Sequence, residues 1–204
     1  MNAFAGRGWT IAPLGPERWA DLERLLDRPG PHRGCWCLWW RIPRKEFGST
    51  TGEQKRRKMK RIVRSGTPPG LLGYADGEPV AWVALGPRTD FAGLEASRLL
   101  RRVDDKPVWS VVCFVVRPEQ RGRGWMHRLL RAAAEYAAQR GASLLEGYPV
   151  DCGGRRLTGD GGYTGIASAF RAEGFHEVAR PKADRPVMRR RLRRRKKSST
   201  ISSR

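Results

Sequence analysis

The segment that most constrains the fold is an apolar run followed by a turn with two glycines and then a helical pattern. Residues 108–116 (VWSVVCFVV) are rich in β-branched and aromatic side chains, which predicts a buried strand. In the following RPEQRGRGWMHRLL, Gly122 and Gly124 stand between arginines, directly before the helical pattern. A helix's first amides have no partner within it, and glycine lets a ligand approach the backbone. The arrangement therefore predicts a site for a diphosphate group.

Known phosphate-binding motifs fit this turn to different degrees. A P-loop requires Gly-Lys followed by Ser or Thr, and the turn has neither. The dinucleotide-binding fingerprint requires a third glycine where His127 stands, although Glu146 lies about 20 residues on, where that fold has its ribose-binding acid. That fingerprint normally opens its fold, whereas a predicted hairpin and other elements precede this turn. An NAD-type oxidoreductase is therefore an alternative that predicts a different cofactor.

The rest of the chain predicts a mixed α/β fold with an antiparallel front half. The sequence LLGYADGEPVAWVAL predicts a hairpin with a type I′ turn at Asp76-Gly77. Thr51 and Gln54 predict a capping box at the start of a basic helix, and Gly141 is expected just after a helix that begins at Met126. Further strands are expected at 9–11, 143–150, 175–179 and 186–192, and further helices after Pro16, over 91–100 and from Thr164 to Gly174.

The turn also resembles the acyl-CoA signature of the GNAT superfamily of N-acetyltransferases. That signature is Arg or Gln, two residues, Gly, one residue, then Gly or Ala; Arg121 and Gly124 match it, whereas Met126 departs from it. The order of elements is similar over about residues 9–192, AFRAEGF (169–175) resembles the family's closing helix, and GCWCLWWR resembles a bacterial branch of uncertain substrate. The resemblance implies a central, mostly antiparallel sheet that is splayed between its fourth and fifth strands and flanked by helices.

The resemblance implies an acetyl-CoA-dependent N-acetyltransferase. An acetyl group would move to a primary amine of a small molecule or peptide by direct attack in a ternary complex, although a longer acyl group stays open. Pantetheine would bond to the fourth strand's backbone, one of whose N–H groups would stabilise the oxyanion, and the pyrophosphate would bind at the turn. The cofactor-binding residues implied are Phe114, Val115, Val116, Arg121, Gly122, Arg123, Gly124, Trp125 and Met126.

Catalysis requires a neutral acceptor amine and a protonated leaving thiol. Since an alkylamine has a pKa of about 10.4, a base or a water relay is needed. Glu146 is the first candidate base, with an ion pair as its alternative role. Many family members place a proton-donating tyrosine where this chain has Phe170, so Tyr163 or Tyr148 are the substitutes, each with packing as its alternative role.

The link between the first two predicted helices is rich in aromatic and thiol side chains. In the family this link builds much of the acceptor site, so Trp36, Trp39 and Trp40 are candidates for an aromatic wall, with packing as the alternative. Cys35 and Cys37 lack the usual zinc spacing and an evident fourth ligand. They predict structural thiols and no metal.

Charge is concentrated at the end of the chain. The net charge is +21, and residues 189–204 hold nine Arg or Lys and no acid. We expect a single domain over 1–192 and a disordered basic tail over 193–204. The tail and the basic helix at 55–64 raise the alternative of a nucleic-acid- or ribosome-associated binding module on a GNAT-like scaffold.

The sequence contains few signals for cellular location or for assembly. No run approaches the ~18 apolar residues of a membrane span, and the N-terminal MNAFAGRGWT lacks the apolar region of a secretory signal. A cytoplasmic protein with no membrane contact is expected, and a homodimer is left open.

Overall fold

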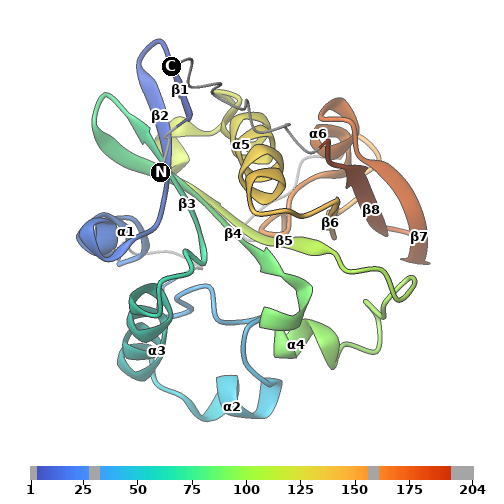
Figure 1. Ribbon diagram of the computed structural model, residues 1–204, viewed down its shortest axis with the longest axis horizontal. Coiled ribbons are helices and arrows are strands. Elements are labelled where there is room, and N and C mark those ends of the chain that lie inside the picture. Colours follow the sequence, from blue (N-terminus) through green and yellow to red (C-terminus); the bar gives the residue numbers. More distant parts are fainter. Residues whose placement is uncertain (1–3, 28–32, 156–160, 194–204) are drawn as a thin grey trace, which may run out of the picture.

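The computed structural model describes residues 4–27, 33–155 and 161–193. Its strands join one sheet in the order β1-β2-β3-β4-β5-β6-β8-β7 (Figure 1). Neighbouring strands are antiparallel except β5 and β6, which are parallel. The strands are β1 (Phe4–Gly6), β2 (Trp9–Pro13), β3 (Gly70–Ala75), β4 (Glu78–Pro87), β5 (Trp109–Val116), β6 (Leu144–Gly147), β7 (His176–Lys182) and β8 (Arg185–Arg191). The helices are α1 (Trp19–Leu26), α2 (Arg44–Ser49), α3 (Gly52–Arg64), α4 (Ala92–Glu95), α5 (Trp125–Gln139) and α6 (Ala167–Ala172), with short 3₁₀ turns at Pro16–Arg18, Arg88–Asp90 and Pro118–Gln120.

Several local predictions are confirmed. Asp76 and Gly77 both have positive φ, 48° and 82°, as a type I′ turn between β3 and β4 requires. Both bonds of the capping box between Thr51 and Gln54 are present at the start of α3. Gly141 follows α5 with a φ of 85°. Each of these signals lies within a few residues, so tertiary context does not override it.

Other boundaries differ from the expectation. A short β1 precedes the first expected strand, so the expected fourth and fifth strands are β5 and β6. The helix expected over 91–100 is reduced to the four residues of α4, and α2 interrupts the expected link. Thr164 does not cap a helix, since Gly165 has a φ of 93° and accepts a hydrogen bond from Val150 N at 2.9 Å. The segment around Gly165 is therefore hydrogen-bonded to Val150, which follows β6, and α6 begins only at Ala167.

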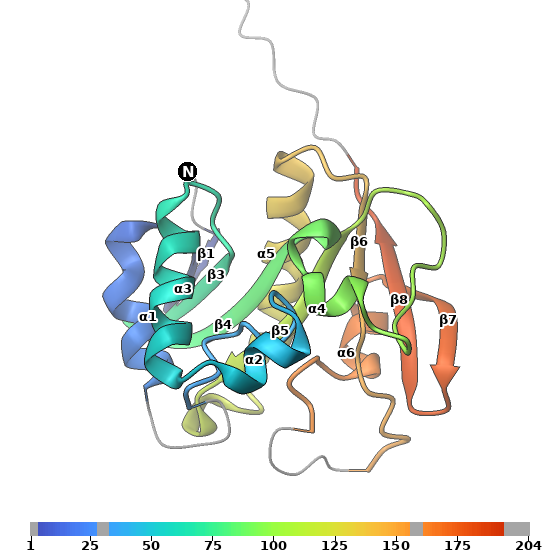
Figure 2. The same ribbon diagram turned by 90° about the horizontal axis from the view of Figure 1, so that it is seen from below.

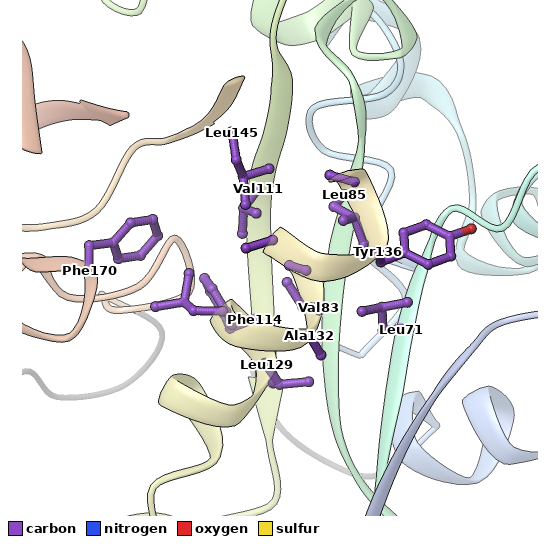
Figure 3. Packing of buried hydrophobic residues seen from close by; sticks show 14 of the residues in the cluster. Leu71, Val83, Leu85, Val111, Phe114, Leu129, Ala132, Tyr136, Leu145 and Phe170 are labelled. Atoms are coloured by element: carbon purple, nitrogen blue, oxygen red, sulfur yellow. The ribbon is translucent and has the colours of Figure 1, made fainter. Parts of the chain in front are cut away.

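The sheet has a buried layer on each face. Side chains of α5 and α6 pack on one face, and Figure 3 shows Val83, Leu85 and Val111 gathered against Leu129 and Ala132 of α5. On the other face α1, α3 and α4 cover a second buried cluster (Figure 1). Figure 2 shows α1 and α3 side by side at one end of the molecule and the β7–β8 hairpin at the other.

The parallel strands β5 and β6 separate after only three paired positions. The last pair is Val111 with Gly147, and β5 continues to Val116 without β6. The register with β4 shifts at the same point, where Val112 is an extra residue opposite Ala84 and Leu85. The mixed α/β fold and its splayed sheet are thus as expected.

Two further expectations concern the rest of the chain. No helix in the described ranges is long and apolar enough to cross a membrane. Of the predicted tail, 193–204, only Arg193 lies within the described residues, so its disorder stays a prediction, as does the single domain over 1–192.

Candidate active site

The glycine turn between β5 and α5 leaves its backbone accessible. Gly122 and Gly124 have φ angles of 75° and 78°, and a Cβ added to either would meet no atom within 4 Å. Gly124 is the N-cap of α5, whose first turn contains no acid. Arg121 N donates to Pro118 O at 3.2 Å, which uses this amide within the turn. The amides that follow are those a helix leaves without internal partners, so the turn suits an anion.

The side chains of the turn divide into two groups. Arg121 and Arg123 are exposed beside the glycines and add positive charge. Trp125 is buried, and its Nε1 donates to Gln120 Oε1 at 3.2 Å. Met126 packs against the α5 core cluster. Trp125 and Met126 therefore have only their backbone amides to offer a ligand at this turn.

Beyond its pairing with β6, the backbone N–H groups of β5 point alternately toward β4 and toward the open edge. Phe114 N donates to Tyr163 O at 2.6 Å, away from β4, whereas Arg117 N donates to Val80 O at 2.9 Å, next to β4. Since successive residues of a strand point to opposite sides, Val116 shares the direction of Phe114, and Val115 turns toward β4. Val115 is therefore not suited to bond a ligand at the open edge, which corrects the expectation for this residue.

A pocket of about 500 Å³ lies where β5 leaves β6, on the face covered by α1 and α3. Trp39 and Trp40 line it, as expected for an aromatic wall, and Tyr163 contributes to it. Trp36 is not among the lining residues; its ring stacks on Trp19 with 5.7 Å between centroids, so Trp36 belongs to the core. The full lining comprises Arg33, Gly34, Cys35, Cys37, Trp39, Trp40, Phe47, Gly52, Lys55, Cys113 and Tyr163.

Three side chains that line the pocket, Cys35, Cys113 and Tyr163, have raised pKa values. Burial, with the nearby Cys37, raises the pKa of Cys35 to about 11. Contact with Cys37, whose Sγ lies 3.7 Å from its own, and burial raise the pKa of Cys113 well above its ordinary value. Burial and the adjacent Cys113 also raise the pKa of Tyr163. Near neutral pH these groups are proton donors rather than bases.

Glu146 lies outside this pocket, in a sealed ion cluster. Its side chain is 1% exposed, and its two oxygens accept from Arg88 Nη1 at 3.0 Å and Arg189 Nε at 2.6 Å. A general base must reach the proton that it removes. The carboxylate is fully engaged by two guanidinium groups and does not reach the pocket, so the structure supports the ion-pair role of Glu146 in place of the expected base.

Tyr148 belongs to the same cluster. Its hydroxyl donates to Glu146 Oε1 at 2.6 Å and lies 2.9 Å from Ser110 Oγ, while Arg88 Nη1 donates to it at 2.8 Å. Burial raises the pKa of Tyr148 well above its ordinary value. The hydroxyl is enclosed, so Tyr148 is not placed to protonate a leaving group. Of the three expected catalytic residues, only Tyr163 lines the pocket.

Phe170 stands where the family carries its tyrosine, and its ring is fully buried. It packs edge-on against Phe114, with 6.1 Å between centroids, and against Phe175 at 4.9 Å. A Cβ on Gly147 would lie 2.2 Å from this ring, so the glycine at the last paired position of β6 makes room for it. Phe170 thus fills the space beside the strand separation.

A splayed parallel pair beside a glycine-led helix is the architecture of acyl-CoA N-acyltransferases. A model of the acetyltransferase (GNAT) family matches residues 20–149. The chain therefore belongs to the GNAT family of acetyltransferases. No curated protein matches the sequence.

Solved structures support the same fold at low sequence identity. Ribosomal-protein-S5-alanine acetyltransferase from Vibrio fischeri is 10% identical, with a TM-score of 0.55 over 94% of this chain and 97% of that one. PaiA N-acetyltransferase from Thermoplasma acidophilum, in complex with coenzyme A, is 16% identical, with a TM-score of 0.51 over 90% and 99%. YncA from Salmonella typhimurium, a putative acetyltransferase with acetyl-CoA, is 14% identical, with a TM-score of 0.53 over 92% and 96%. At these identities the likeness concerns the fold alone.

Proposed function

We propose that this protein moves the acetyl group of acetyl-CoA to a primary amine of a small molecule or peptide. One observation carries the proposal: the accessible backbone of the Gly122–Gly124 turn lies directly after the strand that separates from β6. The similarity to acetyltransferase structures in complex with coenzyme A and acetyl-CoA supports the donor. Residues 1–192 would act as one catalytic domain.

The proposed donor site follows from the backbone directions. The pyrophosphate binds the amides from Gly122 to Met126, with Arg121 and Arg123 beside it, and pantetheine follows the free edge of β5 at Phe114 and Val116. Phe114 N is held by Tyr163 O in this structure. A thioester that takes this amide must therefore displace the Tyr163 carbonyl.

The two substrates approach from opposite faces of the sheet. The turn follows the end of β5 and leads into α5, which packs on one face. The pocket lies on the other face and includes Cys113 of β5, just beyond the separation from β6. A neutral amine in the pocket attacks the thioester carbonyl, so that a C–N bond forms and the C–S bond breaks. The amine's extra proton passes to water, and Tyr163 protonates the departing thiolate. A β5 amide stabilises the oxyanion.

Donor binding is tested by titration calorimetry with acetyl-CoA. Gly124→Ala places a Cβ in front of the accessible amides and should weaken binding about tenfold or more, a change of ~1.4 kcal/mol. Gly66→Ala is the matched control, because Gly66 also has a positive φ, 94°, with no atom within 4 Å of a Cβ. Equal affinity of the two variants, or NAD binding in place of acetyl-CoA, would refute the proposed donor site.

A second function is favoured by a basic groove between α2 and α3. The groove encloses about 590 Å³ and includes Arg57, Lys60, Arg61 and Arg64. Such a surface suits a phosphate backbone, so a nucleic-acid- or ribosome-associated role is the alternative. Gel-shift titration with RNA should then show binding that falls steeply with salt and is lost in Arg61→Gln/Arg64→Gln, while acetyl-CoA turnover is retained.

A further inference from the structure

The pocket on the α1–α3 face is rich in cations. Arg33 and Lys55 line it, and none of its described lining residues is Asp, Glu or His. The Cys35 and Cys113 thiols and the Tyr163 hydroxyl, which line the pocket, have raised pKa values and are protonated near neutral pH. Among the described residues, the pocket therefore presents positive charge and aromatic surface to an acceptor. It has no carboxylate that could pair with the ammonium group of the acceptor.

Lys55 is a cation with no carboxylate partner among the described residues. Its Nζ lies 3.8 Å above the centroid of the Phe47 ring. The carboxylates around α3 are used by other cations: Arg57 Nε pairs with Glu53 at 3.0 Å, and Lys58 Nζ pairs with Glu46 at 2.6 Å. The Lys55 ammonium is thus held at the pocket wall with its charge available to a ligand.

Positive charge in the pocket favours the neutral form of an acceptor amine. Because no base lines the described pocket, the fraction of amine that is already neutral limits the rate. At pH 7 a peptide α-amine, with a pKa of about 7.8, is roughly 350-fold richer in neutral amine than a lysine side chain with a pKa of about 10.4. The pocket therefore suits an α-amine better than a lysine side chain.

Resting on the acetyltransferase activity proposed above, we infer that the acceptor is a peptide α-amine followed by an acidic side chain, and that Lys55 binds that carboxylate. Arg33 adds positive charge at the same pocket, and Trp39 and Trp40 supply the aromatic walls beside the peptide. An acidic second residue would bring to the pocket the charge that its described lining lacks. A basic second residue would meet like charge.

The test compares three peptides that begin Ala-Glu, Ala-Gln and Ala-Lys and are otherwise identical, with thiol release from acetyl-CoA as the readout. We expect kcat/KM to be about tenfold higher for Ala-Glu than for Ala-Gln, and lowest for Ala-Lys. Lys55→Gln should remove the preference for Glu over Gln. Lys55→Glu should reverse it, so that Ala-Lys becomes the best of the three.

Lys45→Glu is the matched control, because Lys45 is exposed on α2 and does not line the pocket. It should keep the order of the wild type. Thermal unfolding identifies any variant that fails to fold. If Lys55→Glu does not fold, the loss of the preference in Lys55→Gln still tests the inference.

The inference and the proposed function fail in different ways. Equal rates for the three peptides, or a preference unchanged by Lys55→Glu, would overturn the inference while acetyl transfer stands. Turnover of small-molecule amines alone would also overturn it. If acetyl-CoA binds but neither these peptides nor a panel of small amines is acetylated, the proposed function fails as well.

Discussion

Two polar clusters flank the point where β5 and β6 separate, and they differ in almost every property. Around Glu146, on the paired side, charges of opposite sign meet at hydrogen-bond distance and are almost wholly buried. Around Tyr163, on the separated side, burial raises the pKa of the phenol hydroxyl, and two cations, Arg33 and Lys55, line a pocket. Full pairing in the first cluster leaves no group to react, whereas the second has a proton to donate and charge to bind a ligand. We therefore expect the Glu146 cluster to stabilise the fold and the Tyr163 cluster to take part in the proposed reaction.

The paired cluster also explains where the strands part. Glu146 lies on β6, Arg189 on β8 and Arg88 in the 3₁₀ turn that follows β4, and their bonds join these three elements next to the last paired residues of β5 and β6. Beyond them Val112 bulges from β5 and the pairing ends. The cluster thereby holds the closed end of the opening that the proposed thioester must enter.

Glu146→Gln should give the largest effect. It leaves Arg88 and Arg189 without a buried counter-charge, so the free energy of unfolding should fall by ~3–5 kcal/mol, as measured by urea denaturation. Glu53→Gln, which changes an exposed carboxylate of α3, should leave the free energy of unfolding almost unchanged. Activity per folded molecule should be kept; a stable but inactive Glu146→Gln would restore its assignment as the base.

Tyr163→Phe should behave in the opposite way. Loss of the proton donor should lower kcat about 100-fold, while the free energy of unfolding changes by less than about 1 kcal/mol. The loss should be smaller for an acyl donor with a more acidic leaving thiol, because such a thiolate needs less help from an acid. Unchanged kcat with both donors would show that water protonates the thiolate.

Tyr148→Phe is the counterpart of Tyr163→Phe in the sealed cluster. It removes a hydroxyl that bonds Glu146, Ser110 and Arg88, so the free energy of unfolding should fall by about 1–3 kcal/mol. We expect kcat to stay within a factor of two of the wild type. A large loss of kcat in a well-folded Tyr148→Phe would show that the sealed cluster also takes part in catalysis.

The smallest effect is expected at the rim of the sealed cluster, where Arg189 Nη1 donates to Asp104 Oδ2 at 2.8 Å. This hydrogen bond lowers the pKa of Asp104 to about 2. Because the folded state favours the ionised carboxylate, its stabilising contribution is present above the ordinary pKa of about 3.9 and is lost as the pH falls toward about 2. Asp104→Asn should flatten the dependence of unfolding free energy on pH in that window, whereas Asp105→Asn should not.

A feature could be predicted from the sequence when the residues that form it lie close together along the chain. The turn at Asp76-Gly77, the capping box at Thr51 and the position of the glycine turn before α5 are short-range signals, and the structure confirms each of them, while a diphosphate site at the glycine turn stays a prediction. The partners of Glu146 lie 58 and 43 residues away along the chain. No local pattern marks Arg88 or Arg189 as a buried cation, so the sequence leaves both a catalytic base and an ion pair open for Glu146, and the assembled fold favours the ion pair.

The tryptophans of the link show the same limit at closer range. Trp36 and Cys37 have φ angles of 49° and 53°, a left-handed conformation that non-glycine residues adopt rarely. The chain turns there, and Trp36 stacks on Trp19 while Trp39 remains at the pocket. The family resemblance implies an aromatic wall, with packing as the alternative, and the backbone conformation separates the residues at the pocket from those in the core.

The central sheet lies between the glycine turn's helix on one face and the pocket on the other, and this separation has an evolutionary consequence. The residues proposed to grip the donor belong to one continuous stretch, 114–126, whereas most of the pocket comes from 33–55. If the proposed sites are right, we expect substitutions in the second stretch to change the acceptor while binding of the thioester is kept. Replacing residues 33–55 with the corresponding segment of a relative that has a different acceptor specificity would be a direct way to change the acceptor.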